Sequence, residues 1–204
     1  MRIGTAGVFY AIAVALALLP PATSGEPPQD LTVSFDSERV KLTVISDTLE
    51  VHGTYYLVCR RSGASVSLFY PFPCDSLLGG ARMVSLSASV GGAPPTPVAW
   101  VASRTAPGVR WRTPPCLGDT ITMDAVYRQK LLTTYARYIV TTTREWQRPL
   151  RLARFEIRLP PGAIPTDFSF PFEEREDATG RYYAYESRGF FPDRDVTVRW
   201  RRAQ

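Results

Sequence analysis

Three cysteines and a single histidine are the residues of this chain whose types suit redox or metal chemistry. Cys59, Cys74, Cys116 and His52 offer the sulfur and nitrogen ligands that zinc prefers. No two of the cysteines stand two to four residues apart, as zinc knuckles require, and alternation along a strand would direct His52 and Cys59 to opposite faces. We therefore expect no metal site and no cofactor, with a four-ligand zinc site as the alternative.

The odd number of cysteines favours one disulfide and one remaining thiol in an oxidising compartment. A turn at Ser62-Gly63 would set Cys59 opposite a residue near Val66, which leaves Cys74 too far along its strand to bridge to Cys59. Cys74 and Cys116 each follow a proline, where we expect strands to end. We therefore predict a Cys74–Cys116 disulfide, with Cys59 as a thiol in the core.

Signatures of catalysis are sparse. No serine lies in a G-x-S-x-G motif, and the sequence contains no Walker loop, dinucleotide fingerprint or H-E-x-x-H motif. Nucleophilic catalysis needs a nucleophile beside a base that a third group orients, so it would depend entirely on His52. We interpret His52 as a surface or hydrogen-bonded strand residue, and we favour a protein without enzymatic activity.

Two acidic clusters offer the carboxylate pairs that glycoside hydrolases use. Both lie in turn-like sequence next to Gly or Pro, so we expect solvated loops, with calcium binding as a minor alternative. A carboxylate-based carbohydrate hydrolase is the enzyme alternative to a binding protein. The clusters are Glu173, Glu174, Glu176 and Asp177 in one run and Asp193 with Asp195 in another.

Three aromatic and proline-rich segments are the candidates for a binding surface. Aromatic side chains at strand ends can stack on sugar rings or contact a partner protein. Alternatively, they close the open ends of a sandwich, where proline also prevents further strand pairing. The candidate binding residues are Tyr70, Phe72, Phe170, Phe172, Phe190 and Phe191.

The beginning of the chain predicts export. Arg2 precedes an uncharged apolar run over residues 8–19 and then the small residues Ala22 and Ser24, an order typical of a secretory signal peptide. An uncleaved membrane anchor is the alternative, but the run is shorter than the roughly 20 residues that normally span a bilayer. We predict a signal peptide over residues 1–24, a linker over residues 25–30, and a mature chain that is soluble in the periplasm or outside the cell.

The net charge of +5 comes mainly from arginines that alternate with apolar residues through the expected strands. Proteins that bind nucleic acid usually gather such charge on one face or run. We therefore expect solvated strand faces and no nucleic-acid partner, with an anionic surface as a secondary possibility.

Short β-branched and aromatic runs, separated by Gly, Pro, Asp or Ser, predict many strands and few helices. Residues 51–59 are apolar on both faces and predict a central strand, Gly91-Gly92 predicts a hairpin turn, and residues 123–132 are the only segment that would pass for a helix. The expected fold is an all-β antiparallel β-sandwich over residues 31–204, with a β-barrel, or two small units joined near Pro94-Pro95, as alternatives. Further strands are expected at residues 31–35, 40–45, 66–70, 83–90, 97–103, 109–112, 120–130, 135–143, 150–159, 168–172, 181–187 and 196–201.

Part of this pattern resembles a known class of protein. Thr141 to Thr143 are followed by Trp146, Pro149 and a run that ends in Leu159-Pro160, and Phe69 to Pro73 joins aromatic residues with prolines. Together these segments resemble secreted bacterial β-sandwich proteins of unknown function. The resemblance implies the sandwich fold and carries no catalytic residues.

The function that these features favour is a secreted or periplasmic binding or assembly module, which acts through exposed sheet edges or loop aromatics. Its expected partner is another envelope or extracellular protein, or a glycan. A small-ligand carrier that uses the interior of a sandwich or barrel is a further alternative.

Overall fold

The computed structural model describes residues 33–118 and 120–202, and the predicted signal peptide and linker lie outside the described residues. These residues form fourteen strands and one short 3-10 helix. In chain order the elements are β1 (Val33–Ile45), β2 (Thr48–Cys59), β3 (Ser67–Pro71), β4 (Leu78–Val90), β5 (Thr96–Pro97), β6 (Trp100–Ala102), β7 (Gly108–Arg112), β8 (Thr120–Leu131), β9 (Tyr135–Tyr138), η1 (Thr141–Trp146), β10 (Leu150–Arg158), β11 (Ala163–Phe168), β12 (Glu173–Asp177), β13 (Gly180–Phe190) and β14 (Val196–Arg202).

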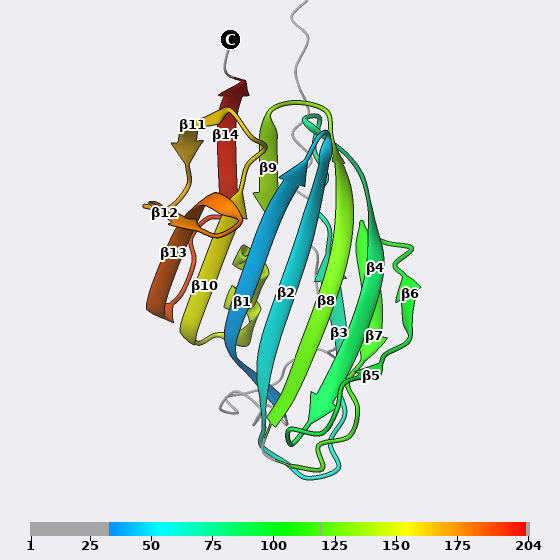
Figure 1. Ribbon diagram of the computed structural model, residues 1–204. Helices are drawn as coiled ribbons and strands as arrows, with labels where there is room; N and C mark the ends of the chain where they lie inside the picture. The colour runs from blue at the N-terminus through cyan, green and yellow to red at the C-terminus, as the bar shows by residue number, and fades with distance from the viewer. Residues whose placement is uncertain (1–32, 119, 203–204) are drawn as a thin grey trace, which may run out of the picture.

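The strands form two packed layers (Figure 1). One layer is an eight-stranded sheet in the order β12-β13-β10-β1-β2-β8-β4-β5, and the other consists of two three-stranded sheets, β11-β14-β9 and β3-β7-β6. This arrangement confirms the predicted all-β sandwich. Within the described residues none of the three sheets closes into a barrel, so that alternative is wrong.

Several local predictions are confirmed. Strand β2 lies between β1 and β8, as its two apolar faces predict, and the segment that resembled a helix is strand β8. Gly91 and Gly92 have φ angles of 58° and 81°, and the N–H of Ala93 donates to the carbonyl of Val90. Two consecutive positive φ angles are the geometry that a tight hairpin turn requires, and glycine adopts it without steric cost.

One strand pair departs from the antiparallel expectation. Strands β1 and β10 are parallel, with Ser37 opposite Leu152 and Thr43 opposite Arg158. The chain reaches β10 from β9, which belongs to the other layer, through helix η1. Because the chain crosses between layers here, β10 can enter the large sheet in either direction, and local sequence does not specify which.

The strand predicted over residues 135–143 is confirmed only in its first part. Strand β9 ends at Tyr138, and the backbone N–H groups of Val140 and Thr141 donate to the Asp195 carboxylate instead of a neighbouring strand. Helix η1 follows, and its C-cap residue Gln147 has a left-handed backbone with φ of 54°. Among the described residues, no helix has the length and hydropathy to span a bilayer.

The core lies between the two layers. Inward positions alternate along β2 and β8, where Leu49, Val51, Ile121 and Met123 are fully buried. In β1 a bulge between Phe35 and Ser37 changes which residues face inward. Before the bulge Val33 and Phe35 are buried, and after it the buried hydrophobic positions are Val40, Leu42 and Val44.

Candidate functional site

The disulfide joins Cys59 to Cys116, with a Cα–Cα separation of 5.8 Å, so the predicted Cys74–Cys116 bridge is wrong. The pairing of β3 with β7 continues past the ends of both strands. The N–H of Cys116 donates to the carbonyl of Ala64 at 2.9 Å, and the N–H of Gly63 donates to the carbonyl of Cys116 at 2.8 Å. This extension brings Cys116 to the end of β2, whereas Cys74 is an exposed free thiol. An intramolecular disulfide is typical of exported proteins.

His52 and the cysteines do not share a site. His52 is exposed on the outer face of β2, with its Nε2 atom 3.8 Å from Oδ1 of Asp124. Thr54 donates to the same oxygen at 2.7 Å. Because Cys59 and Cys116 are bonded to each other, they cannot supply thiolate ligands to zinc. Within the described part of the chain, no three His, Cys, Asp or Glu side chains gather in a group that would hold a metal.

Two of the predicted binding residues belong to the core between the layers. Phe72 is 7% exposed and its ring centroid lies 5.1 Å from that of Tyr127 on β8. The ring of Tyr70 lies 5.8 Å from that of Tyr127 and 5.8 Å from that of Tyr55. These aromatic residues hold β3 and the segment after it against the large sheet.

The other four predicted binding residues lie at the far side of the sandwich. Phe170 stacks on Tyr185 of β13 at 5.1 Å and contacts Phe190 at 5.6 Å, and Phe172 lies 5.7 Å from Tyr185. Phe190 is buried, whereas Phe191 is 44% exposed and lies 4.9 Å from the guanidinium of Arg144. Tyr70 and Phe72 thus belong to one group of aromatic contacts and Phe170, Phe172 and Phe190 to another, while Phe191 contacts Arg144, so the six residues do not form one platform.

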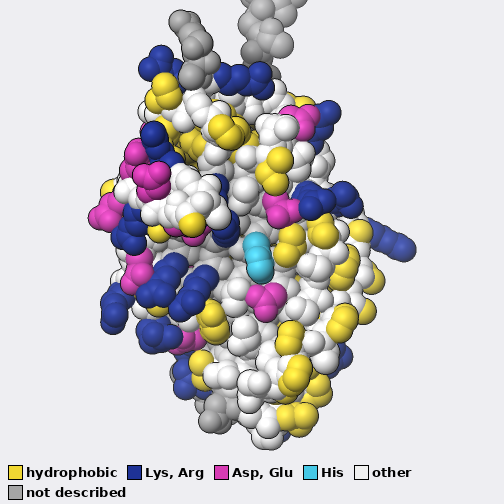
Figure 2. All heavy atoms as spheres, in the orientation of Figure 1, with side chains coloured by type: hydrophobic (Ala, Val, Ile, Leu, Met, Phe, Trp, Pro, Cys, Tyr) yellow, Lys and Arg dark blue, Asp and Glu magenta, His cyan; other side chains and the backbone are white. Residues whose placement is uncertain are grey.

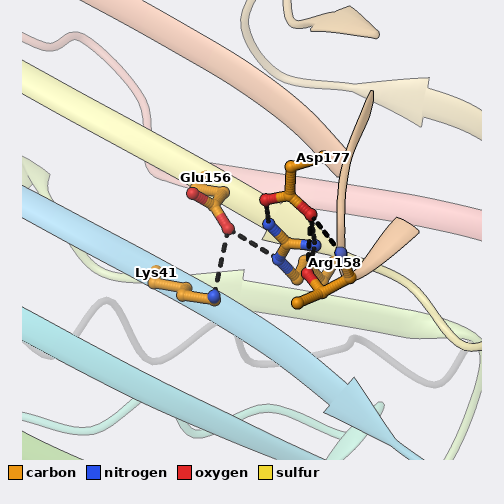
Figure 3. Close-up of polar contacts among 5 residues, drawn as sticks. Lys41, Glu156, Arg158 and Asp177 are labelled. Carbon is orange, nitrogen blue, oxygen red and sulfur yellow. Dashed lines mark hydrogen bonds and ion pairs between the residues drawn. The ribbon is translucent and has the colours of Figure 1, made fainter. Parts of the chain in front are cut away.

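The acidic run is an edge strand, not the loop that its sequence predicts. Strand β12 contains Glu173 to Asp177, all exposed, and pairs with β13. Asp177 accepts from the Arg158 guanidinium at 2.5 and 3.2 Å, and Glu156 accepts from Arg158 at 2.7 Å and pairs with Lys41 at 3.2 Å (Figure 3). The contact with Arg158 holds the pKa of Asp177 well below its usual range. These carboxylates therefore hold β1, β10 and β12 together.

In the second acidic cluster, Asp195 and Asp193 lie in different surroundings. Its carboxylate accepts two bonds from Arg137 at 2.7 and 2.9 Å, and others from the backbone N–H groups of Val140 and Thr141 and the Thr141 hydroxyl. Asp193 instead pairs with the adjacent Arg194, and both side chains are exposed. The two carboxylates thus have different partners, and Asp195 stabilises the turn between β9 and η1.

A buried polar network, which the sequence reasoning missed, joins the layers at Glu38. The Tyr138 hydroxyl donates to Oε2 of Glu38 at 3.1 Å. The Tyr55 hydroxyl lies 3.2 Å from that of Tyr138 and 2.6 Å from that of Tyr70. The network therefore connects β1 and β2 to β9 and β3, strands that belong to both small sheets.

Burial determines the protonation of this network. Removal from solvent raises the pKa of Glu38 to about 8, although the hydrogen bond with Tyr138 acts in the opposite direction. Burial likewise raises the pKa of Tyr55, Tyr70 and Tyr138 well above the usual value. All four groups are therefore neutral at pH 7. Two surface hollows lie around Ser46 and Asp47 at the β1–β2 turn, and neither includes a member of the network.

A third feature is an uncharged, exposed segment along one side of the sandwich. The sequence from Met83 to Ser103 contains no charged residue. Residues 91–102 of this run are exposed with the exception of Val98, which is half-buried, and Val101 and Trp100 are 64% and 37% exposed. The segment contains β5, at the edge of the large sheet, and β6, at the edge of the sheet β3-β7-β6.

Charge is distributed unevenly around this segment. Between Ser76 and Gly118 the sequence has no Asp or Glu, and Arg104, Arg110 and Arg112 are exposed there. Within residues 33–118 and 120–202, no carboxylate lies within 4 Å of these three arginines. Arginines of β10 and β12, by contrast, form ion pairs with neighbouring carboxylates. In Figure 2 acidic and basic side chains mix over β10, β12 and β13, whereas hydrophobic side chains predominate over β4 to β6.

No protein-family model and no curated protein matches this chain. Among solved structures, an M1 zinc metallopeptidase from Deinococcus radiodurans matches with a TM-score of 0.49 and 16% identity, over 82% of this chain and 42% of that one. A mutant M1 zinc metallopeptidase from the same organism, bound to a Tyr-Ser-Ala substrate, matches at 15% identity with the same TM-score and coverage. A two-domain mutant M1 zinc metallopeptidase bound to L-tryptophan matches with a TM-score of 0.48 and 13% identity, over 83% of this chain and 43% of that one. This chain spans less than half of those proteins, and likeness at this level assigns no activity.

Proposed function

We propose that this protein is an exported binding module that receives an extended segment of a partner protein at the open edge of β6. Addition of a strand to a sheet edge is a common mode of protein recognition, because the edge presents unpaired N–H and C=O groups. The partner is expected to be another protein of the cell envelope or the extracellular space. The observation that carries the proposal is the composition of β6 compared with the other edge strands.

Among residues 33–118 and 120–202, six strands lie at the edges of the three sheets: β12 and β5, β11 and β9, β3 and β6. Proteins commonly protect edge strands from pairing by charged residues or proline. Five of the six edges carry such residues, and β6 consists of Trp100, Val101 and Ala102. The protected edges contain Glu173 to Asp177 in β12, Pro97 in β5, Pro165 and Asp167 in β11, Arg137 in β9 and Pro71 in β3.

The backbone of β6 is oriented to accept a further strand. The N–H of Ser103 donates to the carbonyl of Gly108 at 2.9 Å, so this opposed pair is a hydrogen-bonded one. Bonded and non-bonded pairs alternate in an antiparallel ladder, and Val101 opposite Arg110 is therefore also bonded. The backbone groups of Trp100 and Ala102 consequently point away from β7, toward the open edge.

Site-directed photo-crosslinking in the native cell envelope tests the proposal. A photoreactive residue at Ala99, which is exposed beside β6, should yield a discrete protein adduct. Ala102→Pro should abolish it, because proline removes an N–H on the open side while the bonds of Val101 to β7 remain. Val101→Glu should weaken it, because charged residues on an edge strand discourage strand pairing.

Leu132→Glu is the matched control for these variants, since Leu132 is 57% exposed but lies after β8 at another part of the surface. It should leave the Ala99 adduct unchanged, and circular dichroism should show that all variants fold. The proposal fails if Ala99 gives no discrete adduct, or if the adduct survives both Ala102→Pro and Val101→Glu in folded protein.

A further inference from the structure

We propose that the segment received at β6 alternates apolar and acidic residues. This inference rests on the proposed function and adds the chemistry of the partner. The side chains next to the β6 edge differ between the two faces of the sheet β3-β7-β6, and side chains of an added strand would alternate between the same two faces.

The outward face is basic. Val101 of β6 lies opposite Arg110 of β7, which lies opposite Phe69 of β3, so these three side chains share one face. Arg110 lies over the Phe69 ring at 5.3 Å, and Nε of Arg112, on the same face two residues further along β7, donates to the Ser65 hydroxyl at 3.1 Å. Both side chains therefore lean toward β3. A strand added to β6 would lie about 10 Å from β7, because neighbouring strands are about 4.8 Å apart. The Arg110 side chain is long enough to turn from Phe69 toward β6 and meet a glutamate across that spacing, above Val101.

The inward face is apolar. Trp100 lies opposite Trp111, and Ala102 lies opposite Val109. Trp111 and Val109 are 9% and 4% exposed, whereas Trp100, at the open edge, is 37% exposed. An apolar side chain of an added strand would cover Trp100 and extend this face of the core. Burial of such surface is favourable by about 25 cal/mol per Å².

A second copy of this chain fits the edge less well. Symmetric pairing of two β6 strands would bring Arg110 and Arg112 of both copies to one composite sheet, where like charges oppose each other. The stretch around β6, from Ser76 to Gly118, contains no Asp or Glu to compensate them. Charge complementarity therefore favours an acidic partner segment.

Binding of synthetic peptides to the processed protein tests this inference. Fluorescein-labelled nine-residue peptides that alternate Val with Glu, Val with Gln or Val with Lys are compared by fluorescence anisotropy at low salt. The Val/Glu peptide should bind about tenfold more tightly than the Val/Gln peptide, since two ion pairs at an exposed edge are worth about that factor, and the Val/Lys peptide should bind most weakly.

The variants separate charge recognition from edge pairing. Arg110→Gln with Arg112→Gln should remove the preference for Glu over Gln. Arg188→Gln, a matched control on the exposed side of β13, should not. Ala102→Pro should weaken the binding of both the Val/Glu and the Val/Gln peptide.

Each outcome has a distinct meaning. If Val/Gln binds as tightly as Val/Glu, and Ala102→Pro weakens both, the acidic preference is wrong and the proposed function stands. If Val/Glu binds but Ala102→Pro has no effect in folded protein, strand addition is wrong and both proposals fall. If none of the three peptides binds, the inferred alternation is overturned, while the crosslink from Ala99 still decides the proposed function.

Discussion

The hydroxyl group of Tyr138 lies 3.1 Å from Oε2 of Glu38, and this contact joins strand β9 of a small sheet to strand β1 of the large sheet. Glu38 is 1% exposed and has a pKa of about 8, so it carries its proton at pH 7. The Oε1 atom of Glu38 has no hydrogen-bond partner among the described residues. A buried carboxyl group of this kind makes the stability of the fold depend on pH.

The free energy of unfolding should fall as the pH rises from about 4.5 toward 8. In this range the unfolded chain releases the proton of Glu38, since a solvated glutamate has a pKa of 4.5, while the folded protein retains that proton until about pH 8. The resulting slope is up to about 1.4 kcal/mol per pH unit, and the penalty is absent below both pKa values.

Glu38→Gln should flatten this slope, because glutamine does not titrate. Urea unfolding followed by tryptophan fluorescence at pH 5, 6, 7 and 8 measures it. Glu176→Gln on the exposed strand β12 is the control and should keep the wild-type pH profile. An equally steep profile in Glu38→Gln would exclude Glu38 as the source.

Gly53→Ala should destabilise the protein by about 1–3 kcal/mol, although alanine usually suits a strand better than glycine. A Cβ atom at Gly53 would overlap the phenol of Tyr55, whose hydroxyl is fixed by Tyr70 and Tyr138. Gly80→Ala is the matched control, because a Cβ there meets no atom within 4 Å. Thermal unfolding of both variants checks this, and equal melting temperatures would contradict it.

The strand content and the central place of β2 are predictable, because alternation and apolar content act over a few residues. The inward position of Glu38 is not predictable from the sequence. An unbroken period of two that buries Val33 and Phe35 would direct Glu38 outward, and the bulge between Phe35 and Ser37 reverses this. Such a bulge depends on pairing with β2, so the residues around Glu38 alone do not reveal it.

The binding edge is predictable only in part. The uncharged run from Met83 to Ser103 is visible in the sequence, but residues 97–103 are not one strand as expected. The chain leaves the large sheet after Val98, whose N–H donates to the carbonyl of Leu86, and continues as β6 in the other layer. Which strand lies at an edge is decided by sheet order, which is a property of the whole chain.

The cysteine pairing can be checked chemically. Peptide mapping under non-reducing conditions should find Cys59 linked to Cys116 and Cys74 available for alkylation. Replacement of both Cys59 and Cys116 by serine should lower the free energy of unfolding by about 4 kcal/mol, because the bridge spans 57 residues. Cys74→Ser should change it by less than about 0.5 kcal/mol. A bridge that includes Cys74 would contradict the structure.

Asp195→Ala should cost about 2–3 kcal/mol of stability, because one buried carboxylate satisfies Arg137 and two backbone N–H groups at the start of η1. Loss of these bonds leaves the N–H of Val140 buried without an acceptor. Asp193→Ala is the control, and it should have no measurable effect, since Asp193 forms an ion pair with its exposed neighbour Arg194 on the surface. Urea unfolding at pH 7 compares the two variants. An equal loss of stability in both variants would contradict the structural role assigned to Asp195.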